Sequence, residues 1–320
     1  MRRIRWVVVG FLGTALLAGC GEKTPTAKPQ GTVTVAYAGS LEDVNDQIIG
    51  PQFEKATGYA YQGEGGGALG MAQKIRSHTI AANVFESMGY APIQLLEPHQ
   101  ARWAVSFASS PLVIAFNPKS RYGTELTAIK EGKKPLSDLF TLMQSPGFRL
   151  GRTNPNTDPQ GQAFYMMVEL AEKKYHLPAG TASKILGVPD NPHQVYSEEG
   201  ILTLLQSGAL DASSAFLSEA EQRHLDFIRL PQDLNFADPS QNAWYSQASV
   251  RVSSGVVHGS ALTIDITTVG QPSPGALSFV RYVLGPKGQH WMKSAGYTVL
   301  PPQVVGARQA LPKTLRSLVR

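Results

Sequence analysis

Residues 148–171 read FRLGRTNPNTDPQGQAFYMMVELA, and this stretch shows the unit from which the chain is built. Its first seven residues have the composition of a strand. From Phe164 to Ala171, apolar side chains recur every three or four residues, which is the spacing of one buried helix face. A polar turn lies between the two parts, and Asp158 followed by Pro159 is typical of a helix start. The stretch therefore predicts a strand, a tight turn and a helix in succession.

The same alternation of strands and helices extends over most of the 320 residues. Two capping pairs, Ser40 with Asp43 and Ser218 with Glu221, mark further helix starts. Strands are expected at 32–39, 59–67, 81–87, 102–118 (a strand pair), 148–154, 193–197, 209–216, 226–231, 250–254 and 261–269, and helices at 40–58, 68–77, 123–144, 161–176, 198–208, 218–224 and 273–296. This order predicts the α/β class with largely parallel sheets, and the length predicts two domains or lobes.

The N-terminus has the pattern of an export signal. Three arginines precede an apolar run that is too short to span a membrane, and the run ends in Leu-Ala-Gly-Cys at residues 17–20. Residues 1–19 are therefore predicted to be a signal peptide, because this ending resembles the lipobox of bacterial lipoproteins. Cys20, the only cysteine in the chain, would carry the lipid, and residues 20–31 would form the tether. A plain signal peptide with a chance cysteine is the alternative.

Charge and composition exclude several function classes. Removal of the three signal-peptide arginines lowers the net charge from +5 to +2, and no basic-aromatic run points to nucleic acid. The seven histidines do not have metal-ligand spacing, and there is no G-x-S-x-G nucleophile motif. Ser40, Ser87, Asp158 and His258 could form a catalytic set only if the fold brought them together. The glycine cluster at 63–67 is a weak match to a phosphate loop.

Several predicted helix starts could hold an anion. Ser40 follows the first strand, Ser87 ends the third, Gln160 and Gly161 open the helix of the 148–171 unit, and Glu198 opens a later one. Helix N-termini present free N–H groups and a favourable dipole, and in α/β folds ligands bind at this end of the strands. For any one of these positions, an ordinary helix cap is the simpler reading.

The order of these motifs resembles a known family. The pieces are VAYAGSL, GGGALGMAQKIRSHTIAANVFES, NPNTDPQGQAF and FIRLPQDLNFADP followed by WY, and with others they span nearly the whole mature chain. Together they resemble the periplasmic molybdate/tungstate-binding proteins of ABC importers, in particular the archaeal-type branch. The resemblance implies a type II periplasmic-binding-protein fold with two α/β lobes, two crossovers and a ligand cleft between the lobes. Lobe 1 would comprise 32–115 with 266–320, and lobe 2 would comprise 116–265.

The resemblance also implies the residues of the site. Ser40 and Ser87 would give hydroxyls, Gln160 and Glu198 would give backbone donors, and Asp158 would reach the metal of the oxyanion. The full expected site is Ser40, Ser87, Asp158, Gln160, Gly161, Glu198, Phe216 and Tyr245. The chain departs from the family where Ala215 replaces a second carboxylate, Phe216 replaces a tyrosine, and Met88 and Gly89 follow Ser87. These changes leave the anion open, with sulfate as an alternative to molybdate or tungstate.

The expected protein is thus a monomeric binding subunit rather than an enzyme. Its partners would be a small oxyanion, a membrane permease and, through the lipid, the membrane itself, with no nucleic acid. No cofactor and no resident metal are expected. An exported hydrolase on the same fold is the alternative from another class.

Overall fold

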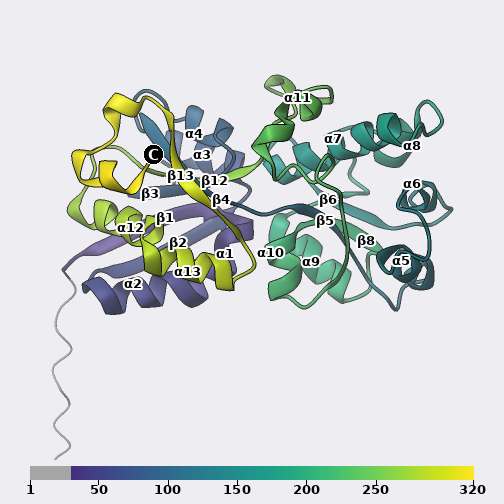
Figure 1. The fold of residues 1–320 in the computed structure, drawn as a ribbon, viewed down its shortest axis with the longest axis horizontal. Helices are drawn as coiled ribbons and strands as arrows, with labels where there is room; N and C mark the ends of the chain where they lie inside the picture. Colours follow the sequence, from purple (N-terminus) through teal and green to yellow (C-terminus); the bar gives the residue numbers. More distant parts are fainter. Residues whose placement is uncertain (1–29) are drawn as a thin grey trace, which may run out of the picture.

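The computed structural model describes residues 30–320, so the predicted signal peptide and Cys20 lie outside the described residues. Two sheets organise the chain, and Figure 1 shows them side by side with helices on the faces of each. This confirms the prediction of two α/β lobes. One buried hydrophobic cluster includes residues of both sheets, and a smaller one lies under α9 and α10 of the second sheet.

The six-stranded sheet forms lobe 1 and has the order β13-β4-β12-β3-β1-β2. Its strands are β1 (Thr32–Ala38), β2 (Ala60–Gly66), β3 (Val84–Met88), β4 (Trp103–Ser109), β12 (Thr263–Thr268) and β13 (Thr298–Gly306). Its helices are α1 (Glu42–Val44), α2 (Gly50–Thr57), α3 (Ala68–Arg76), α4 (Ala91–Gln94), α12 (Pro274–Leu284) and α13 (Pro286–Ser294). Figure 1 shows α3 and α4 on one face of this sheet and α2, α12 and α13 on the other.

The five-stranded sheet forms lobe 2 and has the order β7-β6-β8-β5-β9. Its strands are β5 (Leu112–Phe116), β6 (Leu150–Thr153), β7 (Val195–Tyr196), β8 (Ala212–Phe216) and β9 (Asp226–Arg229). Its helices are α5 (Gly123–Lys130), α6 (Ser137–Leu142), α7 (Pro159–Lys174), α8 (Thr181–Leu186), α9 (Glu198–Gln206), α10 (Leu217–Gln222) and α11 (Asn242–Tyr245), and a hairpin of β10 (Ser249–Val252) and β11 (Gly255–His258) follows.

Short irregular helices complete the fold. The predicted helix at 40–58 is divided into several pieces: η1 (Gly39–Leu41), α1, a π-helical turn η2 (Asn45–Ile49) and α2. Three further 3-10 helices are η3 (Pro239–Gln241), η4 (Arg308–Ala310) and η5 (Lys313–Leu318). A π-helical turn inserts one extra residue per turn and rotates the side chains that follow it.

The two crossovers correct two expectations. Residues 102–118 form two strands, but β4 belongs to the first sheet and β5 to the second, so the first crossover lies between Ser109 and Leu112 rather than at residue 115. The second crossover precedes β12, which begins at Thr263, so lobe 1 resumes before the expected boundary at residue 266. Periodicity identifies a strand but does not identify the sheet to which it belongs.

The sheets are mixed rather than largely parallel. Parallel pairing joins β1 to β2 and β3, and β6 to β7 and β8. The strands that follow the crossovers run the other way: β5 is antiparallel to β8 and β9, and β12 is antiparallel to β3 and β4. A chain that crosses between sheets enters the new sheet against the direction of its parallel strands.

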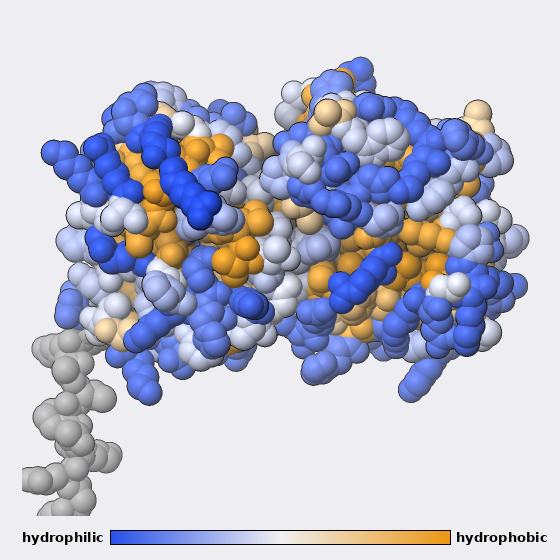
Figure 2. All heavy atoms as spheres, viewed as in Figure 1, coloured by the Kyte–Doolittle hydropathy of each residue, from blue (hydrophilic) through white to orange (hydrophobic). Residues whose placement is uncertain are grey.

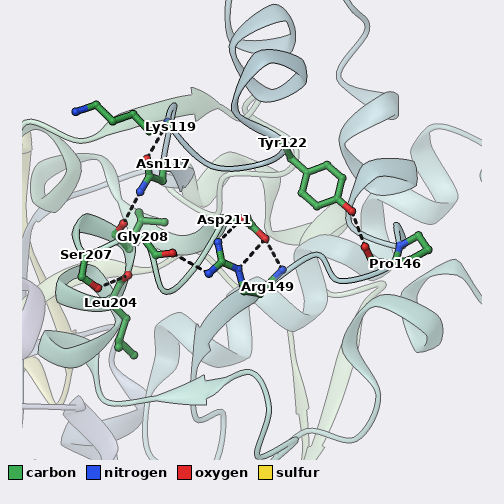
Figure 3. Close-up of polar contacts among 10 residues, drawn as sticks. Asn117, Lys119, Tyr122, Pro146, Arg149, Leu204, Ser207, Gly208 and Asp211 are labelled. Carbon is green, nitrogen blue, oxygen red and sulfur yellow. Dashed lines mark hydrogen bonds and ion pairs between the residues drawn. The ribbon is translucent and has the colours of Figure 1, made fainter.

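A polar cluster holds the outer end of lobe 2. Figure 3 shows Arg149 against Asp211, with Nη2 2.7 Å from Oδ1 and the main-chain N–H donating to Oδ2 at 2.7 Å. The same guanidinium donates to the carbonyl of Gly208 at 2.8 Å, and the Tyr122 hydroxyl donates to that of Pro146 at 2.6 Å. These bonds join the beginnings of β6 and β8. The carboxyl ends of the same strands therefore point back toward lobe 1.

Candidate functional site

The carboxyl ends of parallel strands from both sheets meet where the lobes touch. The turn from β2 into α3 contacts the turn before α7: the Gly70 N–H donates to the carbonyl of Thr157 at 3.1 Å. A Cβ on Gly67 would lie 2.9 Å from that carbonyl oxygen and 3.3 Å from Cβ of Asp158. A glycine at 67 therefore permits the close approach of the two lobes. We call this contact region the junction.

Asp158 is the N-cap of α7. Its Oδ1 accepts the Gln160 N–H at 2.8 Å, and its side chain is 4% exposed. The Gln160 N–H therefore donates to the carboxylate two residues earlier, and its donation to an anion stays a prediction. Gly161 also has a packing reason, because a Cβ there would lie 2.4 Å from the carbonyl oxygen of Thr153. The helix start can pack against the end of β6 only if residue 161 is glycine.

The Gln160 side chain belongs to a buried network inside lobe 2. Its Oε1 accepts the Ser214 hydroxyl at 2.7 Å, and its Nε2 donates to Oε2 of Glu219 at 3.1 Å. The same carboxylate oxygen accepts the Phe216 N–H at 2.7 Å, so Glu219 caps the start of α10. The Phe216 ring lies in the core, so neither its ring nor its N–H is presented to a ligand. The network joins α7, β8 and α10 into one unit.

Ser40 lies on the lobe 1 side of the junction, in η1. Its side chain is 4% exposed, and among residues 30–320 its hydroxyl has no hydrogen-bond partner. Its carbonyl accepts the Tyr297 hydroxyl at 2.5 Å, which fixes the backbone. The predicted capping pair with Asp43 does not form: the cap position of η1 is Ala38, and Asp43 lies 3.6 Å from Arg223 of lobe 2.

Glu198 belongs to lobe 2. It is the first residue of α9, a helix that packs against η1, and the residue is buried. The cap of this helix is Ser197, whose hydroxyl accepts the Gly200 N–H at 3.1 Å. A helix N-terminus leaves its first N–H groups without partners inside the helix. The junction thus packs η1, which carries the buried Ser40 hydroxyl, against α9 of the other lobe.

Comparison with known proteins places this geometry in a family. A family model described as "Bacterial extracellular solute-binding protein" matches residues 33–298. The chain belongs to this family of solute-binding proteins. It is 28% identical to the molybdate/tungstate-binding protein WtpA of Thermococcus kodakarensis, over 97% of this chain and 96% of the relative. It is also 28% identical to an uncharacterized solute-binding protein of Petrotoga mobilis, over 91% of this chain and 90% of the relative.

Solved structures confirm the fold of the solute-binding protein. The periplasmic molybdate-binding protein of Azotobacter vinelandii superposes with a TM-score of 0.57 at 16% identity, over 84% of this chain and 99% of that one. The sulfate-binding protein SubI of Mycobacterium tuberculosis has a TM-score of 0.54 at 10% identity, over 83% of this chain and 86% of that one. The predicted type II periplasmic-binding-protein fold is confirmed.

Ser87 reaches the same edge of lobe 1 as Ser40, since β1 and β3 are parallel neighbours. It lies within β3 rather than after it, and its buried hydroxyl donates to the carbonyl of Gly89 at 2.8 Å. Directly opposite, in β12, stands Asp265, whose Oδ1 accepts the Thr263 hydroxyl at 2.9 Å. Burial raises the pKa of Asp265 to about 6. The oxygen of Ser87 could still accept a hydrogen bond, but its proton is engaged.

Tyr245 is placed differently from the expectation. Its hydroxyl donates to the carbonyl of Gln232 at 2.5 Å, and its ring stacks on Phe236 with centroids 4.4 Å apart. Burial raises the pKa of this hydroxyl to about 12. The residue holds α11 against the segment before it, so the structure gives its side chain a packing role. The Trp-Tyr pair at residues 244–245 therefore contributed to the family resemblance, and its tyrosine packs inside lobe 2.

Sequence reasoning missed three buried polar groups. Asp265 lies in an apolar strand, and a carboxylate in such a strand was the only feature of the sequence that could have indicated a buried polar site. Glu86 in β3 accepts the Asn45 amide at 2.6 Å, and burial raises its pKa to about 7. The sequence predicted a capping pair of Ser218 with Glu221 at this helix start. In the structure, Glu219 caps α10 instead. Among residues 30–320 there is no group of three or more His, Cys, Asp or Glu arranged to hold a metal ion.

Proposed function

We propose that this protein is the substrate-binding subunit of an ABC importer and captures a small oxyanion at the junction, with molybdate or tungstate as the first candidates. The observation that carries this is the Ser40 hydroxyl, which is buried in η1, an element that packs against α9, and has no partner among residues 30–320. A buried hydroxyl without a partner costs free energy, so a ligand that accepts its hydrogen bond supplies what the protein lacks. The names of the WtpA relatives support a metal oxyanion as that ligand.

Binding would be coupled to lobe closure. An oxyanion leaving water needs fixed donors in place of its hydration shell. In this proposal Ser40 gives a hydroxyl from lobe 1, and the N-terminus of α9 gives backbone N–H groups and its dipole from lobe 2. Because the donors come from both lobes, the ligand binds the closed arrangement more tightly and shifts the population toward it. The closed lobes then form one surface for a membrane permease.

Carboxylates near the junction favour a metal oxyanion over sulfate. Asp158 and Glu198 are both buried there. An ionised carboxylate repels a dianion. The metal of molybdate or tungstate can accept a carboxylate oxygen as an additional ligand, whereas the sulfur of sulfate cannot. Sulfate therefore remains the second candidate.

The remaining expectations complete the proposal. Cys20 is the proposed lipidation site, which would hold a monomeric protein on the outer face of a membrane. Among residues 30–320, no helix combines the length and apolar character needed to cross a bilayer. We propose that the protein binds its solute without turnover.

A thermal-shift panel tests the ligand class. The protein is heated with molybdate, tungstate, sulfate and phosphate in turn, since a ligand that binds only the folded state raises the melting temperature by mass action. The proposal predicts a rise with molybdate or tungstate and a smaller rise or none with sulfate. No shift with any of the four anions would reject an oxyanion ligand.

A further inference from the structure

A cavity on the outer side of lobe 1 is separate from the junction. It has a volume of about 530 Å³ and lies between α2, α12 and α13. Its lining is Gln52, Lys55, Ala56, Tyr282, Pro286, Lys287, His290 and Trp291. Two lysines at its rim and two aromatic side chains in its wall combine positive charge with apolar surface. None of these residues serves the proposed oxyanion site.

The charged residues around this cavity favour an anionic ligand. Lys55 and Lys287 are exposed and form no ion pair among the interactions of residues 30–320. The nearest carboxylate in sequence, Glu54, accepts the Tyr61 N–H at 2.7 Å. The N-cap of α13 is Gly285, which has no side chain to cap the first N–H groups, and Pro286 and Lys287 of that first turn line the cavity.

The C-terminal part of the chain, which supplies most of the cavity, is basic. After Asp265 the chain contains no carboxylate side chain, while it contains seven lysines and arginines: Arg281, Lys287, Lys293, Arg308, Lys313, Arg316 and Arg320. All seven belong to lobe 1, because α12, α13, β13, η4 and η5 are formed by this part of the chain. Figure 2 shows strongly hydrophilic side chains lying over apolar surface on the side of lobe 1 where the C-terminal segment runs in Figure 1. A basic C-terminal segment therefore belongs to the same lobe as the cavity.

The position of the cavity indicates its occupant. The Gln30 N–H, the first described residue, donates to the carbonyl of Gly58 at 2.9 Å, and Gly58 follows α2, which gives the cavity Lys55 and Ala56. The chain thus enters lobe 1 beside this cavity. Ten chain steps separate Cys20 from Gln30, so they span at most about 35 Å even when extended. A protein anchored at Cys20 keeps this side of lobe 1 close to the membrane surface.

We infer that the groove between α2, α12 and α13 is a docking surface for anionic phospholipid headgroups of the membrane. The lysines and the start of α13 would bind the headgroup phosphates, and Trp291 and Tyr282 would lie at the level of the interface, where amphipathic aromatic side chains are favoured. The inference rests in part on the proposed lipid anchor. In use, the headgroup contacts would set the orientation of lobe 1 at the membrane surface.

Vesicle binding without the anchor tests the inference. Both sheets and the buried core lie within residues 30–320, so a chain that begins at Gly21 keeps the whole fold. Co-sedimentation is measured with vesicles of pure phosphatidylcholine and with vesicles of equal parts phosphatidylcholine and phosphatidylglycerol. We expect binding to the mixed vesicles at low salt and little binding to the neutral ones. Equal binding to both, or to neither, overturns the inference.

A charge-reversal pair separates the groove from general positive charge. Lys55→Glu with Lys287→Glu should weaken partition to the mixed vesicles by about tenfold or more, since each basic residue contributes to binding an anionic surface. The matched control, Lys119→Glu with Lys134→Glu, makes the same change of net charge on exposed positions of lobe 2 and should change partition much less. Equal losses in the two variants would overturn the groove as the site.

Tryptophan quenching gives a local readout. Lipids brominated on their acyl chains should quench the fluorescence of the vesicle-bound protein. Trp291→Phe should remove most of that quenching, because Trp103 is buried in β4 and Trp244 lies in α11 of lobe 2. Undiminished quenching in Trp291→Phe would contradict the proposed placement. Tungstate binding of the Lys55→Glu, Lys287→Glu variant should equal that of the unchanged chain, so failure of this surface is distinguishable from failure of the oxyanion proposal.

Discussion

The two sides of the junction differ in how their polar groups are satisfied. On the lobe 2 side, Gln160, Ser214 and Glu219 bond to one another, and Asp158 caps the helix that begins there. On the lobe 1 side, the Ser40 backbone is held by Tyr297 while the hydroxyl has no partner among residues 30–320. The comparison teaches that lobe 2 contributes a prearranged framework and lobe 1 contributes an unsatisfied donor. Mutations on the two sides should therefore affect different quantities.

The largest effect is expected inside the lobe 2 framework. Glu219→Ala would leave the Phe216 N–H and the Gln160 amide without their acceptor in a buried site, and should lower the free energy of unfolding by about 3 kcal/mol. Chemical denaturation followed by circular dichroism measures this loss. Glu221→Ala is the control, because Glu221 lies two residues further along the same helix and its side chain is partly exposed. It should lower the free energy of unfolding by less than about 1 kcal/mol. Equal costs would show that the network adds nothing.

A pH-dependent effect of similar size is expected in lobe 1. Burial raises the pKa of Glu86 from 4.5 to about 7, so the folded protein binds a proton that the unfolded chain has released between these values. Stability from this group is complete below about pH 4.5 and is lost as pH rises through 7, by an amount on the order of 3 kcal/mol. Glu86→Gln, which keeps the shape without the charge, should remove this loss and be the more stable form above pH 7. Parallel unfolding curves for both proteins across this range would contradict the burial of the carboxyl.

A smaller effect, on affinity alone, is expected at Ser40. Ser40→Ala should weaken tungstate or molybdate binding by about 1–3 kcal/mol, the cost of losing one donor to a buried charged ligand. It should leave the free energy of unfolding nearly unchanged in the absence of ligand, because no protein group loses a partner. Isothermal titration calorimetry and denaturation provide the two readouts. A loss of stability as large as the loss of affinity would assign Ser40 a structural role instead.

The smallest effect is expected at the ion pair across the lobes. Asp43 and Arg223 are 3.6 Å apart and both are partly exposed, so the pair should stabilise the closed arrangement by less than about 1 kcal/mol. Asp43→Asn should weaken ligand binding by less than about fivefold. Added salt should remove the difference in affinity between the variant and the parent. A larger or salt-independent effect would mean that Asp43 contacts the ligand or its donors.

Much of the fold and part of the site were predictable from the sequence. The strand, turn and helix of residues 148–171 are β6 and α7, because apolar spacing and an Asp-Pro start are local signals. The sheets to which β5 and β12 belong, and the direction of those strands, depend on pairing between distant segments, which periodicity does not encode. The partner of the Gln160 N–H was not predictable for a related reason: the Asp158 side chain two residues away also accepts hydrogen bonds, and the structure shows that it accepts this one.

Direct analysis of the bound element tests the central claim, that Ser40 and the start of α9 hold a metal oxyanion between the lobes. The protein is equilibrated with equal concentrations of molybdate, tungstate, sulfate and phosphate, freed of unbound anion, and measured by inductively coupled plasma mass spectrometry. Ser294→Ala serves as the matched control, since this serine of lobe 1 is exposed and its hydroxyl donates to the carbonyl of Trp291. We predict close to one molybdenum or tungsten per chain in the parent and the control, and a marked loss in Ser40→Ala. Retention of the metal by Ser40→Ala, or a parent that carries neither molybdenum nor tungsten, would contradict the account.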